Sequence, residues 1–278
     1  MKVSGFSFIK DAIRYDYPIG EALRSVLPLC DEVVVAVGKS SDATLDLVQA
    51  IDPKIRILET VWDESLRAGG QVLALETDKA YQAIAADSDW CFYIQGDEVL
   101  HEKDLELVRH AMMQYKDDER VEGLLFNYLH FYGSYDYLAT ASNFYRHEIR
   151  VLRRQAGIFS YRDAQGFRQG ANQKLRVKPI DASIYHYGWV KPPRIMQAKQ
   201  ENFNRYWHDD AWVAKHIAPA DEFDYSDMQS LQLFTGSHPQ VMADRIRQKN
   251  WSFDYDISFE RSSRKDKLKQ WLFRNFGI

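Results

Sequence analysis

The chain has 278 residues, 45% of them hydrophobic, which is typical of a globular protein with a substantial core and argues against a disordered chain. Its 36 Lys and Arg residues nearly balance its 40 Asp and Glu residues, so the net charge of −4 gives no global field for nucleic acid, and we expect no nucleic-acid partner. No signal peptide and no run of about eighteen apolar residues is apparent, so we expect a cytoplasmic protein, with peripheral contact at the inner face of the membrane as an open alternative.

The first hundred residues alternate between predicted strands and helices. Short apolar runs predict strands over residues 2–9, 31–38, 54–62 and 89–95, and apolar residues at helical spacing predict helices over 18–29, 40–51 and 70–86. Such βαβ units build a parallel sheet covered by helices on both faces. Ligands of these sheets collect at the carboxyl ends of the strands, which here are Lys10 and residues 38–42, 62–70 and 95–98.

The pattern changes beyond residue 103. We expect a helix to about residue 114, strands over 121–131, 148–154 and 182–188, and a loop over 163–173. Helical signal returns over 194–215 and 262–276. The predicted fold class is therefore α/β, with a mostly parallel central sheet, an antiparallel extension and a helical carboxyl-terminal region. Cys30 and Cys91 lie in apolar runs without metal-ligand spacing, so we expect buried free thiols in a reducing compartment.

Two adjacent carboxylates, Asp97 and Glu98, follow the fourth predicted strand. Side chains alternate along a strand, so only a turn at its end can present one of these acids to a pocket, and we expect that one to be Asp97. One or two carboxylates together with phosphate oxygens are the usual ligands of Mg²⁺ or Mn²⁺ in nucleotide chemistry. A solvated turn that caps the next helix is the alternative explanation of the pair.

Two further features suggest a site. His186, in a strand of aromatic residues that ends in Gly, has the chemistry to complete a metal site with Asp97, although a hydrogen-bonded core histidine is the alternative. Six arginines within 23 residues have the chemistry to bind a pyrophosphate or an anionic acceptor, although outward-facing solvated charge is the alternative; they are Arg146, Arg150, Arg153, Arg154, Arg162 and Arg168. The GxGxxG, GxxxxGK[ST], GxSxG and CxxC motifs are absent, which argues against the chemistries that they support.

The segments "VSGFSFIKDA", "DEVVVAVGKSSDATLDLV", "DSDWCFYIQGDEVLHE" and "YHYGW" together resemble, in order and spacing, the family-two glycosyltransferases. Members of this family have the GT-A fold and transfer a sugar from a nucleotide-diphosphate donor. The resemblance covers roughly residues 1–190 and implies a GT-A catalytic domain there, with a donor half over about 1–105 and an acceptor half over about 106–190. Residues 191–278 would then form a helical carboxyl-terminal extension packed on it.

The resemblance implies specific site residues, with two departures from the family pattern. The family's Asp-x-Asp motif reads Gln95-Gly96-Asp97 here, so Asp97 keeps the metal position and Gln95 is expected to hydrogen-bond the donor. The two acids that usually end the second strand are missing. The implied donor contacts are Lys10, Gly38, Lys39, Asp42, Arg67, Gln71, Gln95 and Asp97, and the implied ligands of Mn²⁺ or Mg²⁺ are Asp97 and His186.

An inverting transfer also needs a carboxylate that accepts the proton of the acceptor hydroxyl. Our choice is Asp163, with Glu148 and Asp181 behind it. The basic and aromatic tail over residues 262–278 suits an anionic membrane surface, where lipid-linked acceptors would lie, although a helix packed on the body of the protein explains it equally well.

The preferred hypothesis is a metal-dependent, inverting glycosyltransferase that uses a nucleotide-diphosphate sugar donor and a glycan or lipid-linked acceptor in bacterial surface polysaccharide synthesis. One alternative is a catalytically degenerate protein that binds a nucleotide sugar or glycan and partners an active enzyme. Another is a nucleotidyltransferase, but the stretch after the first strand has too little Gly for the loop that those enzymes use.

Overall fold

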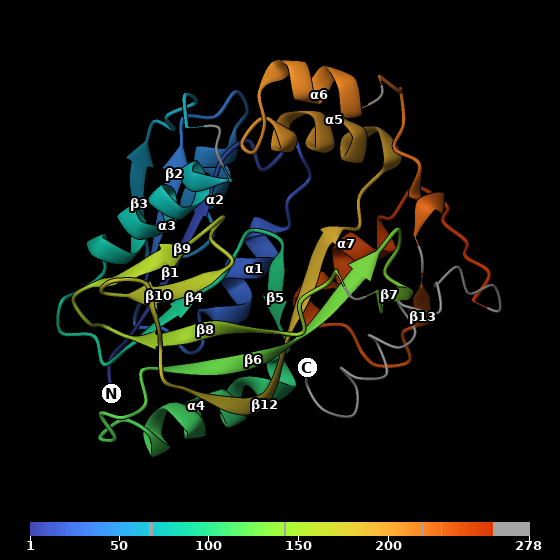
Figure 1. The fold of residues 1–278 in the computed structure, drawn as a ribbon. Helices are drawn as coiled ribbons and strands as arrows, with labels where there is room; N and C mark the ends of the chain where they lie inside the picture. Colours follow the sequence, from blue (N-terminus) through green and yellow to red (C-terminus); the bar gives the residue numbers. More distant parts are fainter. Residues whose placement is uncertain (67–68, 142, 218, 229, 258–278) are drawn as a thin grey trace.

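The computed structural model describes residues 1–278 except 67–68, 142, 218, 229 and 258–278 (Figure 1). Four parallel strands form the amino-terminal half of a ten-stranded sheet: β1 (Val3–Ile9), β2 (Glu32–Gly38), β3 (Ile55–Thr60) and β4 (Trp90–Tyr93). Their spatial order is β4-β1-β2-β3. The connecting helices are α1 (Ile19–Val26), α2 (Thr44–Gln49) and α3 (Gln71–Ala83), in the βαβ order expected from the sequence.

Helices cover both faces of these strands. Alternate residues of β2 divide between two cores, with Val33, Val35 and Val37 on one side and Val34 and Ala36 on the other. The first core packs on α1, α2 and α4 (Leu105–Gln114), and the second packs on α3. A strand that is buried on both faces needs a continuous apolar run rather than an alternating one, and this is why β2 reads "EVVVAVG".

The remaining strands extend the sheet. β8 (His147–Arg153) lies antiparallel between β4 and β6 (Gly123–Tyr132), and β12 (Val177–Trp189) runs parallel to β6. The shorter members are β5 (Glu98–Leu100), β7 (Tyr137–Ala139) and β13 (Leu231–Leu233), each paired antiparallel with β12, β6 or β7. The predicted fold class, a mostly parallel sheet with antiparallel members and a helical carboxyl-terminal region, is confirmed. Cys30 and Cys91 are buried free thiols, as expected.

Two predicted elements were wrong in detail. The predicted loop over 163–173 contains β10 (Gly166–Gln169) and the start of β11 (Gln173–Lys174), which form a second sheet with β9 (Ile158–Tyr161) because Phe167 is buried in the α3 core. The predicted helix over 194–215 is two helices, α5 (Pro193–Asn204) and α6 (Asp210–His216). α6 starts anew because the carboxylate of Asp209 accepts the backbone N–H of Trp212 at 2.7 Å and caps it.

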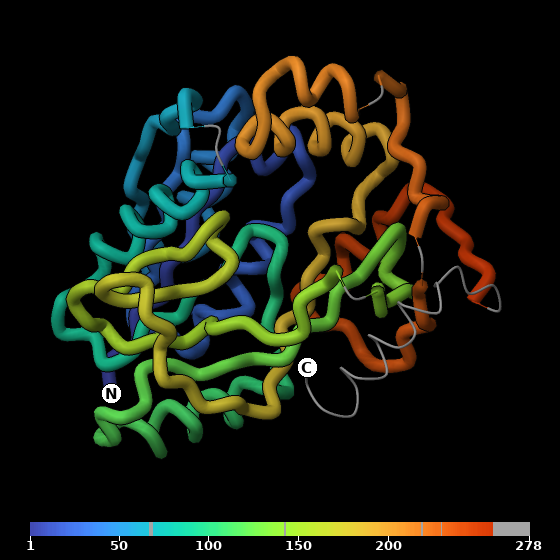
Figure 2. Tube along the Cα trace, viewed as in Figure 1, coloured from blue at the N-terminus to red at the C-terminus, as the bar shows by residue number. Residues whose placement is uncertain are grey.

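The segment that follows β12 crosses the carboxyl ends of the parallel strands. Figure 2 shows residues 193–216, in orange, lying across the end of the blue amino-terminal strands. The chain then adds three short helical turns, η2 (Tyr225–Asp227), η3 (Gln240–Met242) and α7 (Ala243–Arg247), after the single turn η1 (Glu102–Asp104) nearer the amino terminus. Within the described residues, no helix combines the length and the apolar character needed to cross a bilayer. The predicted tail helix over 262–276 lies outside the described residues.

Candidate active site

A cavity of about 750 Å³ opens at the carboxyl ends of the parallel strands, beside α5. Its walls come from the residues after β1, β3 and β4, from the end of β12, from the loops before β8 and β10, and from α5 and the residues that follow it. Five of the predicted site residues line it: Lys10, Gln95, Asp97, Asp163 and His186. The structure therefore brings together residues from both predicted halves of the chain.

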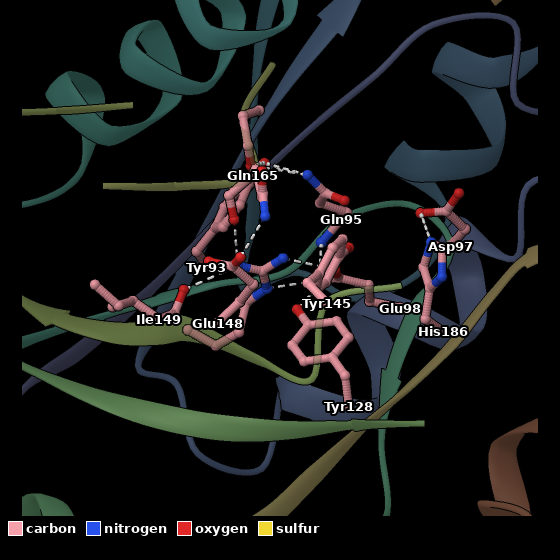
Figure 3. A network of polar contacts seen from close by, with 12 residues as sticks. Tyr93, Gln95, Asp97, Glu98, Tyr128, Tyr145, Glu148, Ile149, Gln165 and His186 are labelled. Carbon is pink, nitrogen blue, oxygen red and sulfur yellow. Dashed lines mark hydrogen bonds and ion pairs between the residues drawn. The ribbon is translucent and has the colours of Figure 1, made fainter. Parts of the chain in front are cut away.

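Asp97 lies in the turn after β4 and its buried side chain lines the cavity. Its Oδ1 is 3.7 Å from His186 Nε2 (Figure 3). Its Oδ2 is 3.4 Å from Lys199 Nζ. Burial by itself would raise the pKa of Asp97, but the neighbouring His186 and Lys199 outweigh it and hold that pKa well below its ordinary value. Asp97 is therefore a charged carboxylate whose side chain is buried and faces the cavity.

A second histidine orients His186. His130 Nε2 donates to the carbonyl oxygen of Tyr145 at 2.6 Å, because a carbonyl can only accept. Burial, together with the nearby His186, lowers the pKa of His130 to about 3, so its ring is neutral and its Nδ1 carries a lone pair. This Nδ1 lies 2.9 Å from His186 Nδ1, which must be the donor. When His186 is neutral, its lone pair is then on Nε2, the nitrogen that faces Asp97.

Asp97 and His186 fit a divalent cation whose remaining coordination positions are filled by the phosphates of a bound ligand and by water. Asp97 offers carboxylate oxygens and His186 an imidazole nitrogen, while no group of three or more His, Cys, Asp or Glu residues in the described part of the chain could hold an ion. A Cβ atom added at Gly188 would lie 2.7 Å from His186 Nε2 and 2.8 Å from Asp97 Oδ2, so glycine keeps the space between them open. Mg²⁺ and Mn²⁺ bound by one or two protein groups together with phosphates and water match this arrangement.

Glu98 has a different environment from its neighbour. Arg150 Nε and Nη2 donate to its two carboxylate oxygens at 2.8 and 2.7 Å, and Tyr128 donates to Oε1 at 2.8 Å. Both side chains of the ion pair are fully buried. Figure 3 shows Glu98 and Asp97 directed to different parts of the structure. Glu98 therefore anchors the turn to β8 and β6, while Asp97 faces the cavity.

Gln95 lines the cavity and joins the turn to the loop before β10. Its Nε2 donates to the carbonyl oxygen of Ala164 at 2.9 Å and to the hydroxyl of Tyr93 at 3.1 Å. Arg150 Nη1 donates to the carbonyl oxygen of Gln165 at 3.1 Å in the same loop. A carboxylate in place of the Gln95 amide could not donate to Ala164, which gives a physical reason for an amide in this chain.

The three candidate bases lie in different environments. Asp163 lines the cavity, and its partial burial raises its pKa. Burial also raises the pKa of Glu148, whose Oε1 accepts from Gln165 Nε2 at 2.6 Å, but Glu148 is not among the cavity-lining residues. Asp181 is exposed and borders a separate groove beside α4. Asp163 alone combines access to the cavity with a raised pKa.

The other predicted donor contacts lie outside the cavity lining or outside the described residues. Gly38 leaves room for a tryptophan, since an added Cβ would lie 2.4 Å from Trp62 Nε1. Asp42 accepts the backbone N–H groups of Arg14 and Thr44 at 2.7 and 3.0 Å. Lys39 and Gln71 are exposed and do not line the cavity. Arg67 lies outside the described residues.

The six arginines do not form an anion site in this cavity, because none of them is among its lining residues in the described chain. Arg150 and Arg153 instead bind other parts of the protein. Arg150 pairs with Glu98. Arg153 donates to the carbonyl oxygens of Val121, Tyr115 and Asp118 and so stabilises the fold.

The segment after residue 192 supplies cavity residues that sequence reasoning missed. Lys199, on α5, reaches Asp97 and donates to the carbonyl oxygen of Gly188 at 2.8 Å. Further amides and aromatic rings follow from Gln200, Asn202, Phe203, Asn204, Tyr206, Trp207 and His208. The dense run of amides and aromatics in "QENFNRYWH", residues 200–208, is the signal that could have indicated a site wall.

The chain matches no protein-family model and no curated protein. Among solved structures it is similar to S. aureus TarS 1-349 in complex with UDP, at 13% identity over 80% of this chain and 68% of that one, with a TM-score of 0.44. It spans 39% of the longer TarS structure. It is also similar to glucosyl-3-phosphoglycerate synthase from Mycobacterium tuberculosis in complex with Mn²⁺, UDP and phosphoglyceric acid, at 17% identity over 46% of this chain and 43% of that one, with a TM-score of 0.31. A mycobacterial protein shares 11% identity over 88% of this chain and 89% of that one, with a TM-score of 0.43.

Proposed function

We propose that the protein is a glycosyltransferase that uses a nucleotide-diphosphate sugar donor. The observation that carries this proposal is the pairing of a charged Asp97 with His186 Nε2, 3.7 Å away, at the wall of a cavity of about 750 Å³. A cavity of this size holds a drug-sized ligand such as a nucleotide sugar. Residues 1–190 would form the catalytic domain, and the extension 191–278 would complete its site through α5.

Asp97 and His186 would hold Mn²⁺ or Mg²⁺ against the donor diphosphate. The bound ion supplies positive charge that stabilises the leaving diphosphate. The protein's own residues orient this site: His130 sets the tautomer of His186, and Glu98 anchors the turn that carries Asp97. Lys199 adds a second positive charge beside Asp97.

Asp163 would act as the base of an inverting transfer. Its raised pKa makes it a stronger base than an ordinary aspartate. It would accept the proton of an acceptor hydroxyl as this hydroxyl attacks the anomeric carbon. We propose a glycan or lipid-linked acceptor, as in the assembly of a bacterial surface polysaccharide.

The test is the substitution Asp97→Asn, with Asp46→Asn as its control, because Asp46 is exposed on α2 away from the cavity. Purified protein with Mn²⁺ should hydrolyse or transfer from at least one nucleotide sugar of a broad panel. Asp97→Asn should lower this rate at least 100-fold, chelation with EDTA should abolish it, and Asp46→Asn should leave it unchanged. A folded protein that turns over no donor of the panel would contradict the proposal.

The same site supports a second candidate, a nucleotide-sugar-binding protein without catalysis. The ammonium of Lys199, 3.4 Å from Asp97, provides a built-in counter-charge that could hold a diphosphate without a metal ion. Tight binding of a nucleotide sugar that is insensitive to EDTA, without turnover, would favour this candidate.

A further inference from the structure

α5 and the residues after it form one wall of the cavity. We use the name α5 wall for five of their side chains: Gln200, Asn202, Phe203, Asn204 and Trp207. Three of them are carboxamides and two are aromatic, while the same segment also brings the ionisable side chains of Lys199, Tyr206 and His208 to the cavity. The wall is held together internally, since Asn204 Nδ2 donates to the carbonyl oxygen of Gln200 at 2.8 Å and the rings of Phe203 and Trp207 lie 6.0 Å apart.

The cavity's strong anion-binding groups already face carboxylates. Lys10 Nζ lies 3.1 Å from Glu64 Oε1, and Lys199 Nζ lies 3.4 Å from Asp97 Oδ2. No arginine lines the cavity in the described residues. A phosphorylated acceptor would need guanidinium or ammonium groups of its own, beyond those that a donor diphosphate uses. The α5 wall offers none, and the further basic side chain from this segment in the lining, His208, stacks on Trp212.

The chemistry of the α5 wall matches a sugar instead. A carboxamide both donates and accepts hydrogen bonds, as a sugar hydroxyl does. An aromatic ring offers an apolar face to the C–H face of a pyranose. The indole N–H of Trp207 is buried and, among the described residues, has no hydrogen-bond partner. Buried donors without a partner are uncommon, and a ligand hydroxyl would satisfy this one.

The α5 wall meets the candidate base at Gly70. A Cβ added there would lie 2.7 Å from Asp163 Cβ and 3.1 Å from Trp207 Cζ2, so these two side chains approach each other across this glycine. Gly70 has a φ of +70° and donates its N–H to the carbonyl oxygen of Tyr206 at 3.1 Å, which ties the start of α3 to the same segment. Trp207 and Asp163 therefore lie beside the same glycine, and both line the cavity.

We infer, on the basis of the proposed function, that the acceptor is a neutral carbohydrate bound by the α5 wall rather than a phosphorylated compound. In the transfer, the acceptor hydroxyl oxygen bonds to the anomeric carbon of the donor sugar. The bond from that carbon to the diphosphate oxygen breaks, and its electron pair leaves with the nucleoside diphosphate. The hydroxyl proton passes to Asp163.

The test measures binding. The full chain, with UDP and Mn²⁺, is titrated calorimetrically with a panel of neutral disaccharides, including cellobiose, maltose and N,N′-diacetylchitobiose, and with glucose 1-phosphate and glycerol 3-phosphate. We expect at least one neutral disaccharide to bind at least tenfold more tightly than either phosphate. Trp207→Ala should weaken that binding at least tenfold while changing the Kd of UDP less than twofold.

The matched control is Trp251→Ala, because Trp251 donates to the carbonyl oxygen of Gly133 and does not line the cavity. It should leave both affinities unchanged. If Trp207→Ala lowers the melting temperature by several degrees, Gln200→Ala removes one amide of the wall and carries the same expectation of weaker disaccharide binding.

Three results would overturn the inference: tighter binding of the phosphates, disaccharide binding that the wall substitutions do not change, or UDP binding without any disaccharide binding. Failure of the proposed function has a different signature, which is the absence of both nucleotide binding and donor turnover. Disaccharide binding that depends on Trp207 would then still support the α5 wall.

Discussion

Gln95 occupies the position where the family pattern has an acid, and its contacts give it a positioning role. Its amide donates to Ala164 in the loop that carries Asp163, so it connects the turn of the proposed metal ligand with the loop of the candidate base. Gln95→Glu keeps the length of the side chain but removes this donor and places a carboxylate against a carbonyl oxygen. We expect kcat to fall about tenfold or more, with the Kd of the donor nearly unchanged, since a loss of about 1.4 kcal/mol is a factor of ten.

Steady-state kinetics and calorimetric titration with UDP would separate these two effects. The control is Gln71→Glu, because Gln71 is exposed at the start of α3 and does not line the cavity. A Gln95→Glu variant that loses donor affinity but keeps kcat would instead make Gln95 a donor contact.

For single residues, the types and positions of the site side chains could be predicted from the sequence, but the side chains that they contact could not. The alternation of side chains along a strand correctly predicted that Asp97 and Glu98 differ, and Asp97 and His186, which were expected to share a metal site, lie 3.7 Å apart. The partner of Glu98 is Arg150, 52 residues away, and only the pairing of β8 between β4 and β6 brings it there. Sequence spacing contains no information on that pairing.

The Glu98–Arg150 ion pair joins two elements, β5 and β8, inside the protein. Removal of either partner leaves an unpaired buried charge, which typically costs about 3–5 kcal/mol of stability. We expect Glu98→Gln and Arg150→Met each to lower the free energy of unfolding by this amount. In the double variant, the loss in free energy of unfolding should be smaller than the sum of the two single losses by about 2 kcal/mol or more, because no charge is then left unpaired.

Urea denaturation of the four proteins measures this coupling. The exposed pair of Arg194 and Glu222, 3.2 Å apart, provides the control, and Arg194→Met should cost about 1 kcal/mol or less. Strict additivity of the Glu98 and Arg150 substitutions would show that the two side chains do not depend on each other.

Elements with strong periodicity could be predicted, whereas those defined by one buried residue could not. The β-branched run of β2 and the apolar run of β4 each gave a strand in the right place. β10 was missed because its stretch is rich in Gly, Gln and Arg, and its burial depends mainly on Phe167. The break between α5 and α6 depends on one cap at Asp209, which periodicity alone does not show.

On the scale of the whole molecule, the cavity is lined by segments on both sides of the predicted boundary at residue 190. The βαβ pattern predicted which edge of the sheet carries the cavity, but not that α5 would cover it, because nothing in the periodicity of residues 193–204 specifies where that helix packs. The predicted boundary at residue 190 therefore separates segments that share one cavity, since Asp97 and Lys199 lie on opposite sides of it and contact each other.

The packing of α3 against β9 buries Asp78 and so makes the free energy of unfolding of the protein depend on pH. This residue of α3 accepts the backbone N–H of Ser160 in β9 at 2.7 Å, and burial raises its pKa to about 6. The folded protein then binds more protons than the unfolded chain between the ordinary pKa of 3.8 and about 6, so the free energy of unfolding falls as pH rises through this range. At about 1.4 kcal/mol per pKa unit, this contribution is at most about 3 kcal/mol.

Asp78→Asn should remove this contribution, because the amide oxygen still accepts from Ser160 and carries no charge at any pH. We expect the variant to be more stable than the natural protein by about 1–3 kcal/mol at pH 7, with the difference shrinking toward pH 4. Urea denaturation at half-unit steps between pH 4 and 7 measures it, with Asp46→Asn as the control for an exposed carboxylate. A variant that is less stable at pH 7 would show that the charged carboxylate stabilises the contact between α3 and β9, contrary to the burial argument.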